Sequence, residues 1–378
     1  MRSADPWHYA RKDVAQSTFA LFEKRLANAL VLFGPRRMGK TEFLLRDLGP
    51  MAEKAGHLVV YVSFWQASLS PAATLVAVLN DGLKQGGLAA QLVRIGQGAS
   101  PRLKLGASLA GVTAETEIDL GNLRGPPPDD VLLLIDHLLG KLARKGKPTL
   151  LLLDEVQELA AGPHNRPLVA ALRTSLDKRR DGLAVVFTGS NRDALAAMFS
   201  EKSAPFFHFA TSIALEPLGP PFVDHLLGAF QKATGAALNK THAHAAFTAL
   251  GGNPFFFRML LERLLPVTDR DIPAALARMR ETLAVDLGYD RLWLSLTATQ
   301  RALAVTLAQE TATPFGEANR IRIGQLARTD PPSIAQTQTA LRRLARLGVV
   351  SRAEGRSSWN FDDPELGRWV ASRTPDQL

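Results

Sequence analysis

Leu32-Phe33-Gly34-Pro35-Arg36-Arg37-Met38-Gly39-Lys40-Thr41 is the stretch that decides the fold of this chain. Residues 34–41 fit the pattern G-x-x-x-x-G-K-[ST] without a mismatch. The apolar run Ala29–Phe33 before them predicts a buried strand, and leucines at helical spacing after them predict a helix. Strand, glycine loop and helix together are the context in which this motif cradles phosphate groups on backbone N–H groups. The stretch therefore predicts a nucleotide-binding site.

Each residue of this loop has an expected place around the nucleotide. Lys40 should reach the β- and γ-phosphates of ATP, and the Thr41 hydroxyl should bind Mg²⁺. The residues expected to surround the phosphates are Gly34, Pro35, Arg36, Arg37, Met38, Gly39, Lys40 and Thr41.

Composition places the chain among ordinary globular proteins. Its 378 residues, 46% of them hydrophobic, predict two or three domains with buried cores. There is no run of eighteen apolar residues and no apolar leader near Met1, so we expect a cytoplasmic protein without a membrane span. The absence of cysteine excludes disulfides and thiolate metal sites, and the histidines are scattered, so Mg²⁺ is the metal we expect. The net charge of +9 is compatible with a polyanionic partner.

A second motif predicts the hydrolytic half of the site. The segment Pro148–Leu159 contains an aliphatic strand that ends in Asp154 and Glu155. A carboxylate at such a strand end can bind Mg²⁺ directly or through water, which is the role we expect for Asp154. Glu155 points elsewhere and would polarise a water for in-line attack on the γ-phosphate.

The next apolar run, Leu183–Asn191, predicts a strand that ends beside the acidic one in a parallel sheet. Ser190 or Asn191 would then hydrogen-bond the γ-phosphate or the attacking water, and a turn or helix-cap role is the alternative. Arg192 follows, either as an arginine that stabilises developing charge or as an ion-pair partner on the next helix.

Two further segments surround this core. Residues 1–27 predict a leading helix that lies against the nucleotide domain, with Arg11 and Lys12 either on a solvated basic face or, as the alternative, near the adenine side of the site. Residues 100–122 alternate with period two on both sides of a glycine-containing centre, which predicts an inserted hairpin. The hairpin either contacts a substrate or partner or extends an edge of the sheet.

After about Leu215 the strand pattern stops and helices are predicted. Their expected ranges are Phe222–Thr234, Thr241–Leu250, Pro254–Leu265 and Ile272–Leu287. Gly251-Gly252-Asn253-Pro254 ends one helix and begins the next, as glycine and proline commonly do. We expect a small helical lid.

The C-terminal region predicts a winged helix: three helices (Thr299–Ala308, Ile323–Arg328 and Ser333–Leu347) and then two short strands. Ile334, Leu341, Leu344 and Leu347 would form the buried stripe of the third helix. From Arg291 to Asn360 ten arginines face four acids, a net charge of +6, which favours a phosphate-binding surface. The candidate contacts to double-stranded DNA are Gln336, Thr339, Arg342, Arg343 and Arg346 on the third helix, with Arg352 and Arg356 in the wing. The alternative is a winged helix that contacts protein or inhibits the ATPase.

In the order of these motifs, the chain resembles the archaeal-type ATPase family of the AAA+/STAND P-loop NTPases, relatives of the Orc1/Cdc6 initiator ATPases. The resemblance rests on residues 34–41, 152–155, 188–190 and 251–254. It implies ATP hydrolysis coupled to movement of the lid and winged helix, with Pro254 near the nucleotide. Initiator-type lids carry a sensing arginine where this chain has Pro254 and Phe255, so Arg258 is the nearest candidate. Nucleotide sites in this group commonly lie at subunit interfaces, which makes a homo-oligomer or a partner protein an expected assembly.

The sequence thus predicts an α/β P-loop NTPase fold with a parallel sheet flanked by helices, an all-α lid and a winged-helix domain. The expected boundaries are 1–27 for the leading segment, 28–216 for the ATPase domain, 217–290 for the lid and 291–378 for the winged helix. The expected function is that of a Mg²⁺-dependent ATP-hydrolysing switch whose winged helix binds DNA. One alternative is a signalling scaffold in which ATP controls self-association, and another is a nucleotide-binding module with little turnover.

Overall fold

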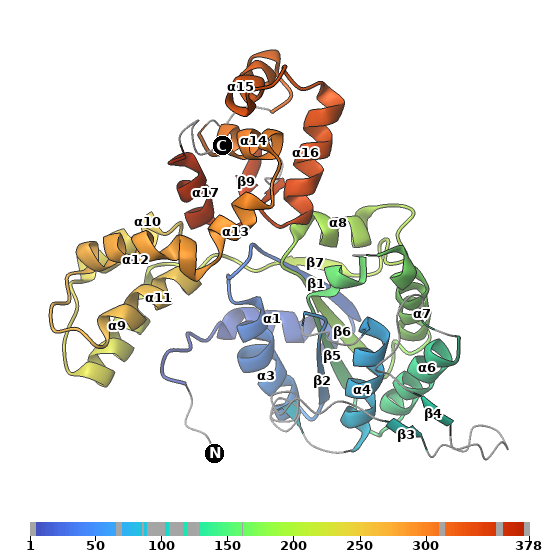
Figure 1. Ribbon diagram of the computed structural model, residues 1–378. Helices are drawn as coiled ribbons and strands as arrows, with labels where there is room; N and C mark the ends of the chain where they lie inside the picture. The colour runs from blue at the N-terminus through green and yellow to red at the C-terminus, as the bar shows by residue number, and fades with distance from the viewer. Residues whose placement is uncertain are drawn as a thin grey trace.

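A five-stranded parallel sheet forms the centre of the computed structural model (Figure 1). The model describes residues 5–65, 70–84, 87–88, 103–105, 116–118, 127, 129–160, 162–309, 314–352 and 358–373. The strand order is β2-β5-β6-β1-β7. The strands are β1 (Ala29–Phe33), β2 (Leu58–Ser63), β5 (Thr149–Asp154), β6 (Leu183–Thr188) and β7 (Thr211–Ala214).

Helices cover both faces of this sheet, which explains why its inner strands do not alternate between apolar and polar residues. In β1, Leu30 and Leu32 pack on one face and Val31 packs on the other. The first face is covered by α1 (Lys12–Glu23) and by the helix that follows the phosphate loop. The second face is covered by α4 (Pro71–Lys84), α6 (Asp129–Ala143), α7 (Arg166–Asp177) and α8 (Arg192–Ser200).

The helix after the phosphate loop is irregular. It begins as α2 (Lys40–Glu42), widens into the π-helical η1 (Phe43–Leu48) and ends as α3 (Gly49–Lys54). Pro50 explains the widening, because proline has no N–H to donate and its ring would collide with the carbonyl four residues earlier. The sequence predicted the helix but not this change of pitch.

The edge strand β7 had no signal in the sequence. Thr211 and Ser212 are exposed, so the strand shows no alternation of apolar and polar residues. Two short 3₁₀ helices, η3 (Val156–Ala160) and η4 (Pro163–Asn165), follow β5. The strands β3 (Leu103–Leu105) and β4 (Thr116–Ile118) pair antiparallel in a separate sheet, so in their described part they do not extend the main one. The other residues of the hairpin expected at 100–122 lie outside the described residues.

A helical segment follows the sheet. It contains α9 (Pro220–Thr234), α10 (Lys240–Ala249), α11 (Pro254–Leu264), α12 (Ile272–Asp286) and α13 (Tyr289–Leu294). Between α10 and α11, Gly251 and Gly252 both have positive φ, and the Asn253 side chain accepts a hydrogen bond from Phe255 N. The Gly-Gly-Asn-Pro step therefore ends one helix and caps the next.

The winged helix consists of α14 (Ala298–Gln309), α15 (Glu317–Ala327), α16 (Ile334–Arg346), β8 (Val350–Arg352), β9 (Trp359–Phe361) and α17 (Pro364–Ala371). Ser333 and Gln336 form the expected capping box of α16. The prediction that Ile334 belongs to the buried stripe is wrong: it is 51% exposed in the first turn. Thr337, Ala340, Leu341 and Leu344 form the buried face instead, and α16 packs on α14. The final helix α17 was not predicted.

One hydrophobic core runs from Phe222 in α9 to Val370 in α17, so the lid helices and the winged helix share their packing. The boundaries expected near residues 216 and 290 stay predictions. In Figure 1 this part of the molecule lies beside and above the edge of the sheet at which the strands end, with α16 reaching down to α8. None of the helices in the described ranges is long and apolar enough to cross a membrane.

Candidate active site

The phosphate loop leaves β1 at the carboxyl edge of the sheet and ends at α2. Gly39 has φ +85°, a left-handed conformation that favours glycine, and it immediately precedes α2. The loop thus presents the N-terminus of a helical stretch towards the site, as phosphate binding requires.

Lys40 is folded back onto the phosphate loop. Its side chain is buried, and Nζ donates to Gly34 O and Pro35 O, each at 2.7 Å. Burial lowers the pKa of Lys40 from 10.5 to about 8, although the nearby carboxylates of Glu155 and Asp154 favour the charged form. The two carbonyls hold the ammonium group at the place where phosphate oxygens would replace them.

Asp154 lies at the end of β5 and is 1% exposed. Its Oδ2 accepts from Thr41 Oγ1 at 2.7 Å and from the Tyr61 hydroxyl at 3.0 Å, while Oδ1 accepts from Thr188 Oγ1. Burial and the adjacent Asp154 raise the pKa of Tyr61, so the phenol remains a donor. The Thr41 hydroxyl and the Asp154 carboxylate therefore meet across the site. Because both are oxygen ligands of the kind that Mg²⁺ prefers, this pair fits the expected ion.

Glu155 follows Asp154 with a positive φ of 57°, which is rare for a residue with a side chain. This conformation turns its carboxylate towards β6, where Oε2 accepts from Ser190 N at 3.2 Å and from Ser190 Oγ at 2.7 Å. The parallel pairing of β5 with β6 brings Ser190 to this position, since Leu153 lies opposite Phe187. Such strained residues concentrate at functional sites.

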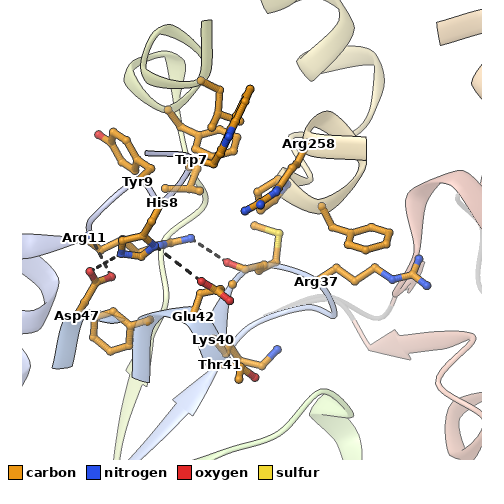
Figure 2. Close-up of a pocket in the computed structure, with 18 of the residues that line it drawn as sticks. Trp7, His8, Tyr9, Arg11, Arg37, Lys40, Thr41, Glu42, Asp47 and Arg258 are labelled. Atoms are coloured by element: carbon orange, nitrogen blue, oxygen red, sulfur yellow. Dashed lines mark hydrogen bonds and ion pairs between the residues drawn. The ribbon is translucent and has the colours of Figure 1, made fainter. Parts of the chain in front are cut away.

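A cavity of about 390 Å³ joins these groups to the helical segment, within the size range of small-molecule sites. Figure 2 shows its labelled lining residues: the N-terminal segment and the phosphate loop face each other, with Arg258 approaching from α11. From the expected site the cavity is lined by Arg37, Met38, Gly39, Lys40, Thr41, Glu155, Ser190, Pro254 and Arg258. Trp7, His8, Tyr9, Leu218, Phe222 and Leu226 form much of the rest, so one end of the cavity is aromatic and apolar.

Arg11 is not on a solvated basic face, which corrects the prediction from sequence. It is 9% exposed, and its guanidinium donates to Met38 O at 2.9 Å (Figure 2). The guanidinium also donates to Glu216 O. Its backbone N–H donates to Asp47 Oδ2 at 3.2 Å. Arg11 thereby ties the leading segment to the phosphate loop and to the start of the lid. Periodicity did not reveal this, because the arginine lies just before α1 rather than on one of its faces.

The structure separates the two candidates at the end of β6. Ser190 lines the cavity, whereas Asn191 does not. Asn191 Oδ1 caps α8 by accepting from Ala194 N, and Nδ2 donates to Ala345 O in the last turn of α16 at 2.9 Å. The proposed reading of the γ-phosphate by Asn191 is therefore not supported, and the helix-cap alternative describes it. Arg192 begins α8.

The lid candidate Arg258 reaches the cavity but carries ion pairs of its own. Its Nε donates to Glu262 Oε1 at 3.1 Å, and Nη1 lies 3.9 Å from Asp5 Oδ2. Pro254, at the N-terminus of α11, lines the same side.

The outer side of the phosphate loop contacts the winged helix. Arg37 Nη1 pairs with Asp363 Oδ2 at 2.6 Å, and the Tyr289 hydroxyl donates to the same oxygen at 2.8 Å. The Arg36 guanidinium lies against Gly348, where an added Cβ would stand 2.9 Å from it. The motif predicted both arginines around the phosphates and predicted no contact between them and the winged helix.

The DNA-contact candidates share one solvent-facing surface. Gln336, Thr339, Arg342, Arg343 and Arg346 are exposed on α16, and Arg352 is exposed on β8. The Gln336 side-chain oxygen is used by the capping box, where it accepts from Ser333 N at 2.8 Å. Arg356 lies outside the described residues.

Several residues of the site were not predicted from the sequence. Trp7, His8 and Tyr9 line the cavity although they precede the first helix. Asp47 is a buried acid among leucines, and His8 Nε2 lies 2.7 Å from its Oδ1. A carboxylate on the apolar face of a predicted helix was the available signal, because such a group is rarely buried without a partner.

Comparison with known proteins found similar structures but no similar sequences. No protein-family model matches the chain, and no curated protein matches its sequence. Among solved structures, the Walker-type ATPase PABY2304 of Pyrococcus abyssi is similar, with a TM-score of 0.64 and 15% identity over 95% of each chain. The ORC2 protein of Aeropyrum pernix, in complexes with ADPNP and ADP, gives a TM-score of 0.58 and 15% identity over 98% of this chain and 96% of that one. The chain therefore has the fold of archaeal Walker-type and ORC-type ATPases, as its motifs predicted.

Proposed function

We propose that this protein is a Mg²⁺-dependent ATP-binding and ATP-hydrolysing switch of AAA+/STAND type. One observation carries the proposal: Lys40, Thr41, Glu155 and Ser190 line one cavity, and Thr41 Oγ1 lies 2.7 Å from Asp154 Oδ2. These are the groups that phosphoryl transfer to water requires. The similar ORC2 protein of Aeropyrum pernix was solved with ADPNP and ADP, which supports the same ligand class here.

In this proposal each group has one task. The phosphate loop and Lys40 bind the β- and γ-phosphates, and the lysine exchanges its two carbonyl contacts for phosphate oxygens. Thr41 and Asp154 would hold Mg²⁺, which would supply positive charge beside the phosphates. Ser190 Oγ gives up its contact with Glu155 to donate to the γ-phosphate or to the attacking water, while Ser190 N still donates to Glu155.

Glu155 accepts a proton from water while the water oxygen attacks the γ-phosphorus. The bond between that phosphorus and the β–γ bridging oxygen breaks, and ADP leaves as the second product. The aromatic end of the cavity, with Trp7 and Tyr9, receives the base.

Two substitutions test this assignment. Glu155→Gln keeps the size of the side chain but removes the base, so we expect retained ATP binding and turnover that is about 10²- to 10⁴-fold lower. Lys40→Ala should lose ATP binding instead. Phosphate release and equilibrium ATP binding by the purified variants measure both effects, and unchanged hydrolysis by both variants would contradict the mechanism.

We further propose that the exposed face of α16 binds double-stranded DNA. The five exposed candidates on α16, with Arg352 in the wing, carry donors suited to phosphates and base edges. Arg342→Glu/Arg346→Glu should weaken retention on duplex DNA and reduce the salt dependence of log K by about one unit for each lost phosphate contact. Arg278→Glu/Arg291→Glu changes charge equally at exposed positions of α12 and α13 and is the matched control.

A second candidate function is supported by the contact between Asn191 and Ala345, which shows that α16 already packs on protein. In a scaffold of this kind the winged helix binds protein and ATP controls assembly. Loss of the salt-dependent DNA binding only in the α16 variant favours the switch on DNA. Equal DNA binding by both double variants favours the scaffold.

A further inference from the structure

The Glu155 carboxylate is held through one of its two oxygens. Oε2 accepts from Ser190 N, from Ser190 Oγ and from Gln157 Nε2. Oε1 accepts no hydrogen bond from the described residues. One oxygen is therefore anchored, and the other is left to meet a water.

Gln157 supplies the anchor on the same strand end, from the first turn of η3. Its side chain is 6% exposed, and Nε2 also lies 3.4 Å from Ser190 Oγ. The opposite amide orientation would place Oε1 against the anionic Oε2 of Glu155, which is repulsive. The nitrogen must therefore face the carboxylate.

The other end of this amide has no partner. Gln157 Oε1 is buried without a hydrogen bond from the described residues. A buried acceptor without a hydrogen bond destabilises a protein. Its presence in a site therefore indicates that the side chain has another role there. The hydrogen bond from Gln157 Nε2 to Glu155 Oε2 is the contact that this orientation of the amide makes possible.

Gly189 provides the space that the amide occupies. A Cβ at this position would stand 2.3 Å from Gln157 Oε1, closer than any ordinary contact. Gly189 does not have a positive φ, so its backbone does not need glycine. Glycine at position 189 therefore leaves space for the Gln157 side chain, and the backbone conformation there does not require it.

We propose that Gln157 is a positioning residue that orients the Glu155 carboxylate for hydrolysis, with Gly189 as the slot for its amide. The inference rests on the proposed ATPase function. Gln157 touches neither ATP nor water in this scheme. It fixes Oε2, so that Oε1 faces the attacking water and accepts its proton.

Steady-state kinetics of Gln157→Leu, Gly189→Ala and the double variant test the inference. Leucine removes the amide at similar volume, and alanine at 189 displaces it. Each single variant should lower kcat about 10- to 100-fold, less than loss of the base itself, with KM for ATP changed less than about twofold. Since both substitutions break the same contact, the double variant should be no slower than the slower single one. A merely structural role would instead change KM or give multiplying effects.

Wild-type kcat in Gln157→Leu, or multiplying effects in the double variant, would overturn the inference while leaving the ATPase assignment in place. If wild-type protein releases no phosphate, the ATPase assignment itself fails. In that case, hydrogen exchange of the Gln157 side-chain amide, followed by NMR, tests the contact between Gln157 and Glu155 independently of hydrolysis. Slow exchange that becomes faster in Glu155→Ala shows that the amide is held by Glu155, and equal exchange in both proteins shows that it is not.

Discussion

The two sides of the phosphate loop differ in what they touch. On the inner side, Lys40 and Thr41 face Asp154 and the cavity. On the outer side, Arg37 pairs with Asp363 and Arg36 lies against Gly348, both in the winged helix. Only two residues separate Arg37 from Lys40 in the chain, yet Lys40 faces the proposed nucleotide site and Arg37 pairs with a distant element.

This difference shows how a conserved chemical task leaves room for a second one. A phosphate-binding loop fixes its glycines, lysine and hydroxyl, and leaves four positions open. Here two of the open positions carry arginines, whose planar guanidinium groups suit ion pairs between packed elements. Under the proposed function, the loop binds ATP on one side and contacts the winged helix on the other.

Among these predictions, the largest change in ATP affinity should come from a substitution on the inner side of the phosphate loop. Lys40→Ala removes the charge that the phosphates need, and we expect ATP affinity to fall about a hundredfold, since charge-assisted contacts contribute about 1.5–3 kcal/mol each. Isothermal titration measures this, and Arg36→Ala, which does not line the cavity, is the control from the outer side of the loop. Equal losses in the two variants would show that the two sides do not have separate tasks.

The affinity for ATP should also depend on pH through Lys40. Because the pKa of the free protein's Lys40 is about 8, the ammonium loses its proton above that pH. ATP binds the charged form, so affinity should fall as pH rises, about tenfold by pH 9. The free energy of unfolding depends on pH in the opposite direction. Between about pH 8 and 10.5 Lys40 binds more protons in the unfolded state than in the folded state. The contribution of Lys40 to the free energy of unfolding therefore rises with pH in this range.

Titrations from pH 7 to 9.5 test this, with Lys40→Arg as a variant that stays charged. A flat profile in the wild type, or an equal decline in Lys40→Arg, would exclude Lys40 as the titrating group.

Breaking the ion pair on the outer side should have a smaller effect. Asp363→Asn keeps an oxygen to cap α17 but removes the charge that pairs with Arg37. We expect a loss of about 1 kcal/mol in the free energy of unfolding, because the Arg37 side chain is partly exposed. By thermodynamic reciprocity, ATP affinity should change by no more than about fivefold.

Chemical denaturation and ATP titration measure these two effects. Asp271→Asn, at the N-terminus of α12 and without an ion pair in the described residues, is the matched control. A hundredfold loss of ATP affinity in Asp363→Asn would remove the distinction between the two sides.

The smallest effect concerns Gly348. Gly348→Ala and Gly235→Ala both place alanine at a positive φ, 65° and 73° respectively. Each should cost about 1 kcal/mol through backbone strain. Only at 348 does the new Cβ meet a side chain, that of Arg36, whereas space is open at 235.

We therefore expect Gly348→Ala to be less stable than Gly235→Ala by a few tenths of a kcal/mol, because the flexible arginine can move aside. Parallel thermal unfolding compares the two. A larger loss in Gly235→Ala would show that Arg36 does not pack on Gly348.

The sequence predicted the parts of this molecule that local patterns determine. The motif at residues 34–41 and the strand before Asp154 have strong periodicity and fixed spacing, and both are in the expected places. The neighbouring ends of β5 and β6 also followed, since parallel strands end at one edge.

The remaining features depend on contacts between distant segments. Arg11 reaches Met38 and Glu216, and Asn191 reaches Ala345, through separations that no local pattern encodes. The edge strand β7 is half polar and therefore carried no signal. Gln157 could have been found only by knowing that Gly189 lies across from it.

ATP bound on the inner side of the loop should change the position of the winged helix on the outer side. The chain has no cysteine, so spin labels at Lys54→Cys in α3 and Ala318→Cys in α15 report a single distance. Pulsed electron resonance in the Glu155→Gln background, with and without Mg²⁺-ATP, measures it. We predict a shifted distance distribution when ATP is bound, and an unchanged distribution at saturating ATP would contradict the account.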